Sequence, residues 1–420
     1  MVFYKYFFLP VSLLLIFPAF IFSQDIKPSA DSLKEGAINV FVDCNFCDLD
    51  FFRKQVKFVN YVRDRKEAQV HILSAYQPTA SGGGAYTFFF IGQKKFTGIN
   101  DTLVYNSKAD ATMDEKREGQ IRVIKMGLLR YVSKTPMAGY ISIDMNTPLS
   151  TENVKDKWKS WVFNFDAGGF MSGEQLHQSF STWTSVSAKR ITEKWKIEFN
   201  LGSDYNESRY QVNDTTKIKS ITRSKHFNHL LVKSLNDHWS AGGFMNAGSS
   251  DYINIKLSGN ASPAIEYDLF PYSQATRKQL RILYSAGYDY FYYKDTTIFN
   301  KTEEGLWSER LAIAFEIKQK WGSLSSAIVG SNYLHDFSLY NVFFRPGINV
   351  RIFKGLSVRL GGSISLIHDQ IALPKAGATL AQILLQQRQL ATQYSYWATF
   401  GISYTFGSIY NNVVNPRFNQ

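Results

Sequence analysis

The chain has 420 residues, a formal net charge of +12 and 15% aromatic residues, including 24 Tyr and 33 Phe. Its mean hydropathy of −0.21 excludes a bundle of transmembrane helices, each of which needs about 20 apolar residues. A charge balance does not identify a fold, but abundant aromatic residues are typical of membrane β-barrels.

The N-terminus carries the one long apolar run of the sequence, Phe7–Phe22, which follows Lys5 and precedes a polar exit. This order predicts a secretory signal peptide over residues 1–24, removed on export. A membrane anchor is the alternative, although the run is short and two prolines interrupt it. Because an exported protein does not meet nucleic acid, we expect no nucleic-acid partner. The positive charge then suits a lumen or contact with anionic lipid of the outer membrane.

Residues 25–36 predict a flexible leader, and residues 37–135 predict a small α/β domain. Ile38–Val42 has the pattern of a buried strand, and Leu49–Tyr61 has apolar residues at helical spacing behind a capping Asp48. Strand patterns at Gln69–Ala75 and Ala85–Ile91 precede a second amphipathic helix. That helix is predicted over Thr112–Ser133, with Asp110 or Thr112 as its cap. We expect this domain in the periplasm, because it precedes an exported barrel.

Cys44 and Cys47 are the only cysteines. A strand, a C-x-x-C pair and a helix in this order also occur in thioredoxin-like redox motifs. We favour a local disulfide, because the surrounding pattern does not predict the rest of a thioredoxin sheet. Cysteine pairs of exported proteins also meet an oxidising compartment, in which disulfides persist. Two cysteines are too few for a four-cysteine zinc site.

After a predicted linker at residues 136–156, residues 157–408 alternate apolar and polar side chains in segment after segment. The pattern predicts a transmembrane antiparallel β-barrel of about twelve strands, so the fold class is an all-β barrel preceded by a small α/β domain. Residues 409–420 form a C-terminal tail. The predicted strands are Trp161–Gly169, Phe180–Ala188, Trp195–Tyr205, Lys219–Leu231, Trp239–Gly248, Ile253–Ile265, Gln279–Tyr290, Leu306–Lys318, Leu324–Leu334, Val342–Ile352, Leu356–Ile367 and Tyr394–Phe406.

Loop lengths give a separate indication of topology. Short predicted turns alternate with long polar connections, as in barrels whose two termini are both periplasmic. This parity implies an even number of strands. The turns are Thr192–Lys194, Asn236–His238, Lys320–Gly322 and Phe353–Gly355, and the long connections are Asn206–Lys217, Asp295–Gly305 and Asp369–Thr392.

Five stretches resemble a family of uncharacterised outer-membrane β-barrel proteins typical of Bacteroidetes, which carry an N-terminal periplasmic α/β domain. The resemblance covers both predicted domains and implies an outer-membrane location, without an established activity. The stretches are Val59–Leu73, Tyr86–Gln93, Tyr333–Tyr340, Leu373–Tyr396 and Phe406–Phe418.

Charged residues of the predicted strands fall on the face opposite the large apolar side chains. Arg or Lys on the lipid face costs about 2–4 kcal/mol near the bilayer midplane, so these residues are predicted to face the lumen. They are consistent with a pore that favours anions, or with a filled lumen in which the charges pair internally. The residues are Arg281, Asp289, Arg310, Glu316, Lys318, Arg345, Arg351 and Arg359.

Two His-Asp pairs, His335-Asp336 and His368-Asp369, follow the ninth and eleventh predicted strands. Adjacent residues on a strand point to opposite faces, which favours polar strand ends over metal ligands or a hydrolytic site. His226 and His229 also fall on opposite faces of a predicted strand, which argues against a shared role as metal ligands. We therefore expect no metal, no cofactor and no catalytic residues.

The sequence favours a porin-like passive channel with a basic lumen. The first alternative is a membrane anchor or assembly component that binds a periplasmic protein through the α/β domain. An outer-membrane lipid hydrolase is third, because no G-x-S-x-G motif occurs.

Overall fold

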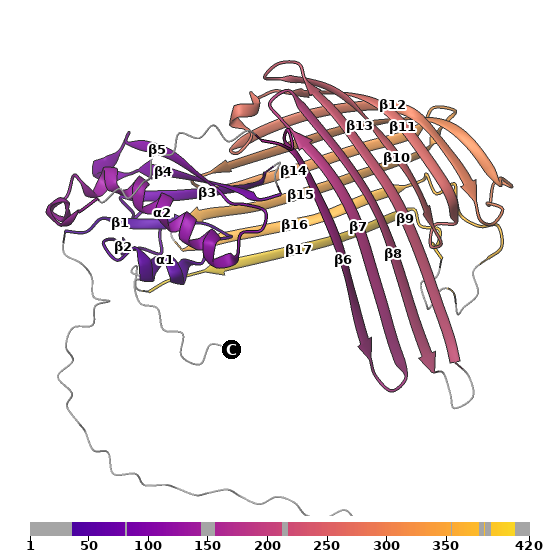
Figure 1. The fold of residues 1–420 in the computed structure, drawn as a ribbon, viewed down its shortest axis with the longest axis horizontal. Coiled ribbons are helices and arrows are strands. Elements are labelled where there is room, and N and C mark those ends of the chain that lie inside the picture. The colour runs from indigo at the N-terminus through magenta and orange to yellow at the C-terminus, as the bar shows by residue number, and fades with distance from the viewer. Residues whose placement is uncertain are drawn as a thin grey trace, which may run out of the picture.

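The structure is a computed structural model that describes residues 36–79, 82–143, 156–211, 217–353, 355–377, 382 and 388–407. These residues form a small α/β domain followed by a twelve-stranded antiparallel sheet (Figure 1). The predicted fold class is therefore confirmed. The predicted signal peptide and the tail at residues 409–420 lie outside the described residues, as does most of the leader and of the linker.

The α/β domain contains a five-stranded sheet in the order β2-β1-β3-β4-β5. Strand β1 pairs in parallel with β2 and β3, whereas β3, β4 and β5 pair antiparallel. The strands are β1 (Asn39–Asp43), β2 (Asn60–Tyr61), β3 (Val70–Pro78), β4 (Gly84–Gly92) and β5 (Asn100–Asn106).

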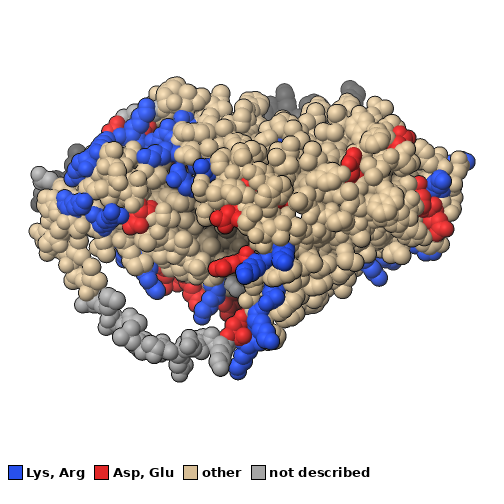
Figure 2. All heavy atoms as spheres, turned by 90° about the horizontal axis from the view of Figure 1, so that it is seen from above, with Lys and Arg blue, Asp and Glu red and all other residues tan. Residues whose placement is uncertain are grey.

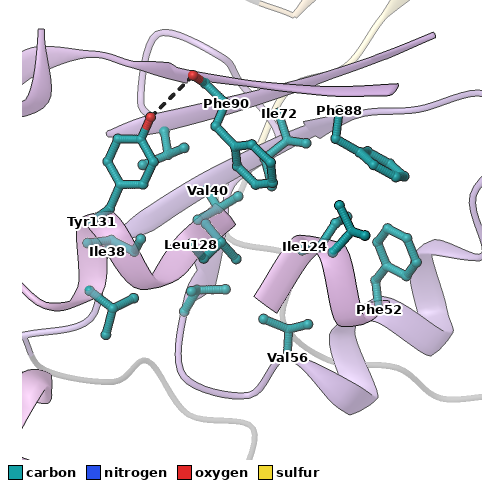
Figure 3. Packing of buried hydrophobic residues seen from close by; sticks show 14 of the residues in the cluster. Ile38, Val40, Phe52, Val56, Ile72, Phe88, Phe90, Ile124, Leu128 and Tyr131 are labelled. Atoms are coloured by element: carbon teal, nitrogen blue, oxygen red, sulfur yellow. Dashed lines mark hydrogen bonds between the residues drawn. The ribbon is translucent and has the colours of Figure 1, made fainter. Parts of the chain in front are cut away.

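Two helices pack on this sheet and enclose its core. Helix α1 (Leu49–Gln55) is capped by the carboxylate of Asp48, and α2 (Met113–Val132) begins with a capping box between Thr112 and Glu115. Figure 3 shows apolar side chains of both helices meeting those of the strands. The hydroxyl of Tyr131 donates to the carbonyl of Phe90 at 3.2 Å, and burial raises the pKa of Tyr131 to about 12.

Three features of this domain differ from the prediction. The first helix ends at Gln55, and Asn60–Tyr61 forms the edge strand β2 instead of continuing the helix. The backbone N–H of Asn60 donates to the carbonyl of Ile38, just before β1, and that of Val62 donates to Val40 in β1. Pairing with a distant strand therefore outweighed the helical spacing. Strand β5 was not predicted, because its side chains are half polar and it lies at the sheet edge. Short 3-10 turns occur at Lys94–Phe96 and Pro136–Tyr140, and a third, Tyr272–Gln274, lies between the eleventh and twelfth strands of the chain.

The second part of the chain is an antiparallel meander in which every strand pairs with its neighbours in sequence. Its twelve strands confirm the predicted number. They are β6 (Trp161–Gly173), β7 (His177–Ile191), β8 (Trp195–Gln211), β9 (Lys217–Ser234), β10 (Trp239–Ser250), β11 (Ile255–Asp268), β12 (Lys278–Tyr293), β13 (Glu303–Gln319), β14 (Gly322–Tyr333), β15 (Asp336–Phe353), β16 (Leu356–Ile367) and β17 (Tyr394–Tyr404).

Several strands run further than the apolar pattern predicted. The predicted loop Asn206–Lys217 is largely strand, because β8 continues to Gln211 and β9 begins at Lys217. The backbone hydrogen bonds between strands do not require apolar side chains, so a prediction from hydropathy places the strand ends too early. The predicted turns between β7 and β8, β9 and β10, and β13 and β14 lie where expected.

The sheet curls so that β6 to β9 pass in front of β14 to β17 in the view of Figure 1. Within the described residues no backbone pairing joins β6 to β17, so the barrel-like sheet has two end strands. Among these residues, no helix combines the length and apolar composition of a membrane span.

Candidate functional site: the inner face of the twelve-stranded sheet

The two faces of the sheet differ sharply in chemistry. On β17, Phe400 and Ile402 are 86% and 73% exposed on the outer face, while Ser403 and Thr399 lie on the other. Figure 2 shows that the wall of the sheet seen from above is largely free of charged side chains. Lys and Arg gather instead over the α/β domain in that view.

Aromatic side chains of the outer face concentrate near both ends of the strands. Trp and Tyr residues lie at the ends nearest the α/β domain, here called the domain end, and again at the opposite far end. The domain-end set is Trp161, Trp195, Trp239 and Tyr404, and the far-end set is Tyr290, Trp307, Tyr394 and Tyr396. Aliphatic residues such as Leu201, Leu311, Ile328 and Leu360 are exposed between them.

The predicted lumen residues share the opposite, inner face. Strand register places Arg281, Ala314, Ala327 and Arg345 directly opposite one another on four consecutive strands. Arg310 lies opposite Ser285, which is nearly buried. By the same register Glu316 lies opposite Gln279, and Arg359 lies opposite Asn349.

Some of these charges have partners on the same face. Lys318 Nζ lies 2.7 Å from Glu316 Oε1, and Arg281 Nε lies 3.8 Å from Glu266 Oε2. Asp289 accepts hydrogen bonds from Asn260, at 2.8 Å, and from the hydroxyl of Ser308.

The side chains of Arg310, Arg345 and Arg359 form no ion pair or hydrogen bond with another described residue. Arg345 borders a cavity of about 410 Å³ together with Arg281, Glu316 and Trp397. Three arginines of the inner face therefore have no acidic partner among the described residues, and the inner-face carboxylates of Asp166 and Asp289 likewise form no ion pair.

Arg351 lies at the domain end of this face but points into the α/β domain. Its guanidinium pairs with both carboxylate oxygens of Asp43, and the Nη2–Oδ1 distance is 2.7 Å. Two further contacts join the same surfaces. Arg65 donates to the carbonyl of Lys320, and the backbone N–H of Gly355 donates to Asp64 at 3.2 Å. The α/β domain thus sits at the end of the sheet that carries the short turns.

His71 lies behind this ion pair and is fully buried. Its Nε2 is 3.5 Å from Asp43 Oδ2, and neither ring nitrogen forms a hydrogen bond within the described residues. Burial lowers the pKa of His71, although Asp43 opposes the shift, so the ring is neutral at pH 7. Burial alone would raise the pKa of Asp43, but Arg351, with His71, holds that pKa well below its usual range.

The remaining sequence candidates have local partners. Cys44 and Cys47 form a disulfide just before α1. The ring of His368 lies 4.6 Å from that of Tyr340, and Asp369 accepts from Asn341 at 3.2 Å. Asp336 accepts from Ser338, while the ring of His335 lies 6.1 Å from that of Tyr333. The described residues contain no group of three or more His, Cys, Asp or Glu arranged to hold a metal ion.

A serine, a histidine and an aspartate approach one another on β8 and β9. The hydroxyl of Ser224 donates to Asp204 at 2.8 Å, whereas the His226 ring faces Asn200 at 3.1 Å and Asp204 at 4.0 Å. The hydroxyl is thus bound to the carboxylate and not to the imidazole, which is not the order of a hydrolytic relay.

Sequence reasoning missed a row of asparagines on this face and the docking residues Asp43, Asp64, Arg65 and His71. Alternation along each strand indicates that the asparagines point inward. Their alignment into one row depends on pairing register, and the docking contacts join segments some 300 residues apart.

Comparisons with known proteins gave similarity among solved structures but none among protein families or curated proteins. No family model matches the chain, and no curated protein matches it. Among solved structures, the chain is similar to the translocator domain of the autotransporter NalP from Neisseria meningitidis. The two share 10% sequence identity with a TM-score of 0.20, over 59% of this chain and 82% of that domain.

Proposed function

We propose that the protein is a porin-like passive channel of the bacterial outer membrane, with a basic lumen and the α/β domain in the periplasm. The outer face supports the membrane part of this proposal. An exposed apolar band between two sets of aromatic residues matches the hydrocarbon layer between its two interfaces. The shortest strand of the twelve-stranded sheet, β17, has 11 residues. This length suffices for a tilted membrane-spanning strand, which needs about 9–11 residues.

The observation that carries the channel proposal is the presence of three arginines without an acidic partner on the inner face. A filled lumen would neutralise its charges in pairs, because an unpaired buried charge is costly. Arg310, Arg345 and Arg359 remain without such partners among the described residues. Water that fills the lumen would solvate them, and their field would favour anions.

The test is conductance of the full-length mature protein in planar lipid bilayers. We expect steady current steps that scale with salt concentration, and a reversal potential in a KCl gradient that shows anion preference. A refolded barrel, verified by circular dichroism and heat-modifiable gel mobility, that gives no steps would contradict the channel. Cation preference would contradict the basic lumen.

A second function is favoured by the docking of the α/β domain. The Arg351–Asp43 ion pair fixes this domain at the domain end of the sheet, as an anchor for a periplasmic protein requires. Bilayers that stay silent while the domain crosslinks to one defined periplasmic protein in cells would favour the anchor over the channel.

A further inference from the structure

One row of side chains crosses the inner face from β6 to β12. Strand register places the residues directly opposite one another on consecutive strands, so their side chains share one face and lie about 5 Å apart. All but two are asparagines. This row, here called the amide track, is Asn164, Ser187, Asn200, Asn228, Asn246, Asn260 and Asp289.

The amide track runs obliquely along the wall. Asn164 lies near the domain end of β6, which begins at Trp161, whereas Asp289 lies near the far end of β12, which finishes at Tyr293. Each strand in between places its track residue further from the domain end. The track therefore connects the two ends of the inner face.

Hydrogen bonds link the three residues of the amide track that lie nearest the far end, Asn246, Asn260 and Asp289. Asn246 Nδ2 donates to Asn260 Oδ1 at 3.3 Å, and Asn260 Nδ2 donates to Asp289 Oδ1 at 2.8 Å. Ser262 also donates to Asn260, at 3.1 Å. An amide has two donors and an acceptor with two lone pairs, so groups remain for a ligand after these bonds are made.

A cavity of about 650 Å³ opens beside these three residues. Its walls combine amides and hydroxyls with the aromatic rings of Phe244 and Tyr333 and the guanidinium of Arg310. The carboxylates of Asp289, Glu309 and Asp369 also line it. Such a volume is within the range of sites for small organic ligands. The three carboxylates accept hydrogen bonds from neutral side chains: Asp289 from Asn260 and Ser308, Glu309 from Tyr284 and Asn332, and Asp369 from Asn341.

We propose that the amide track binds a neutral linear oligosaccharide and guides it along the lumen. Neutral amides both donate and accept, which matches sugar hydroxyls, whereas a wall of one charge would select ions. Equivalent partners at regular spacing let one hydroxyl pattern move from site to site at little cost. The aromatic rings beside Asn246 and Asn260 provide apolar contact for the faces of a sugar ring. Guidance rests on the proposed channel, but binding does not.

The test measures binding of maltohexaose and cellohexaose to the detergent-solubilised full-length protein by calorimetry, and block of single-channel current by the same sugars. We expect millimolar binding by at least one of them. Asn246→Leu with Asn260→Leu is expected to weaken it about thirtyfold, equivalent to about 2 kcal/mol, because two hydrogen bonds to the ligand are lost. Asn246→Ser with Asn260→Ser keeps the site polar and serves if the leucine variant does not fold. Asn349→Leu, on the inner face but outside the track, is the matched control and is expected to bind as the wild type does.

Each outcome decides one of the two proposals. No binding of either sugar to folded wild-type protein would overturn the amide track, even where conductance shows an open channel. Equal weakening by Asn349→Leu would also overturn it. Binding in detergent that depends on Asn246 and Asn260, with silent bilayers, would support the track and contradict the channel.

Discussion

The guanidinium of Arg351 on β15 donates to both carboxylate oxygens of Asp43 at the end of β1, across a sequence separation of 308 residues. The pair joins the α/β domain to the twelve-stranded sheet. His71 of the α/β domain lies beside it, with Nε2 3.5 Å from Asp43 Oδ2. Asp43→Asn is expected to lower the free energy of unfolding of the α/β domain by about 2 kcal/mol, since it leaves a charged partner without its acceptor. A urea titration followed by helical circular dichroism at 222 nm measures this.

The control for Asp43→Asn is Asp101→Asn. Asp101 pairs with Arg130 at 3.8 Å on the surface, and such pairs contribute little. Equal effects of the two substitutions would show that the Arg351–Asp43 pair does not stabilise the docked domain.

The stability of the α/β domain is expected to fall as the pH drops from 7 to about 5. His71 is the one histidine between residues 36 and 143, and burial lowers its pKa in the folded state. In the unfolded chain His71 takes up a proton near its ordinary pKa of about 6.5, whereas in the folded domain it stays neutral at that pH. The free energy of unfolding therefore falls as the pH drops below about 6.5. The lowered pKa of Asp43 acts in a separate window, since its contribution is lost only below about pH 4.

Urea midpoints of the wild type and His71→Gln at a series of pH values measure this effect. The variant should lack the decline between pH 7 and 5 whatever its absolute stability. A decline that persists in His71→Gln would assign it to other groups.

Reversing two inner-face charges is expected to reverse the ion preference of the proposed channel. Arg345→Glu with Arg359→Glu replaces two unpaired cations of the lumen wall by anions, so the reversal potential should move toward cation preference. Lys94→Glu with Lys95→Glu changes the net charge equally but within the α/β domain, and should leave selectivity unchanged. Identical selectivity in both variants would contradict a lumen lined by Arg345 and Arg359.

Gly127→Ala in α2 is expected to destabilise the domain although alanine favours helices by about 1 kcal/mol. An added Cβ would lie 2.1 Å from Cζ of Phe90, a ring fully buried in the core, and overpacking costs roughly 1–3 kcal/mol. Gly139→Ala is the control, because no atom lies within 4 Å of its added Cβ. The same urea titration compares them, and a stabilised Gly127→Ala would show that the core has room at this point.

Replacement of Cys44 and Cys47 by alanine is expected to cost about 2 kcal/mol, since the bond closes only a very short loop. A structural disulfide also predicts that the full-length protein does not reduce a test disulfide such as insulin. Catalysed reduction that disappears in the double alanine variant would instead assign a redox role to the pair.

Local periodicity in the amino-acid sequence is enough to predict the regular elements of this protein. Alternation of apolar and polar residues indicated the twelve strands and their inner and outer faces, because side chains of a strand alternate whatever it pairs with. It equally indicated α2, with Asp110 or Thr112 as its cap, and the structure has Thr112 at that position. The ends of strands such as β8 and β9 were predicted too short, since polar residues extend a backbone ladder without leaving an apolar signal.

Which residues of distant segments come into contact depends on the folded structure as a whole. Asn200, Asn228, Asn246 and Asn260 become one track because backbone pairing aligns four strands in one register, and a shift by a single residue would turn each side chain to the other face. Arg351 has the alternation of a lumen residue, yet it pairs with Asp43 because the α/β domain packs at the end of its strand. Pairing and docking of this kind depend on contacts between distant segments, about which a local pattern carries no information.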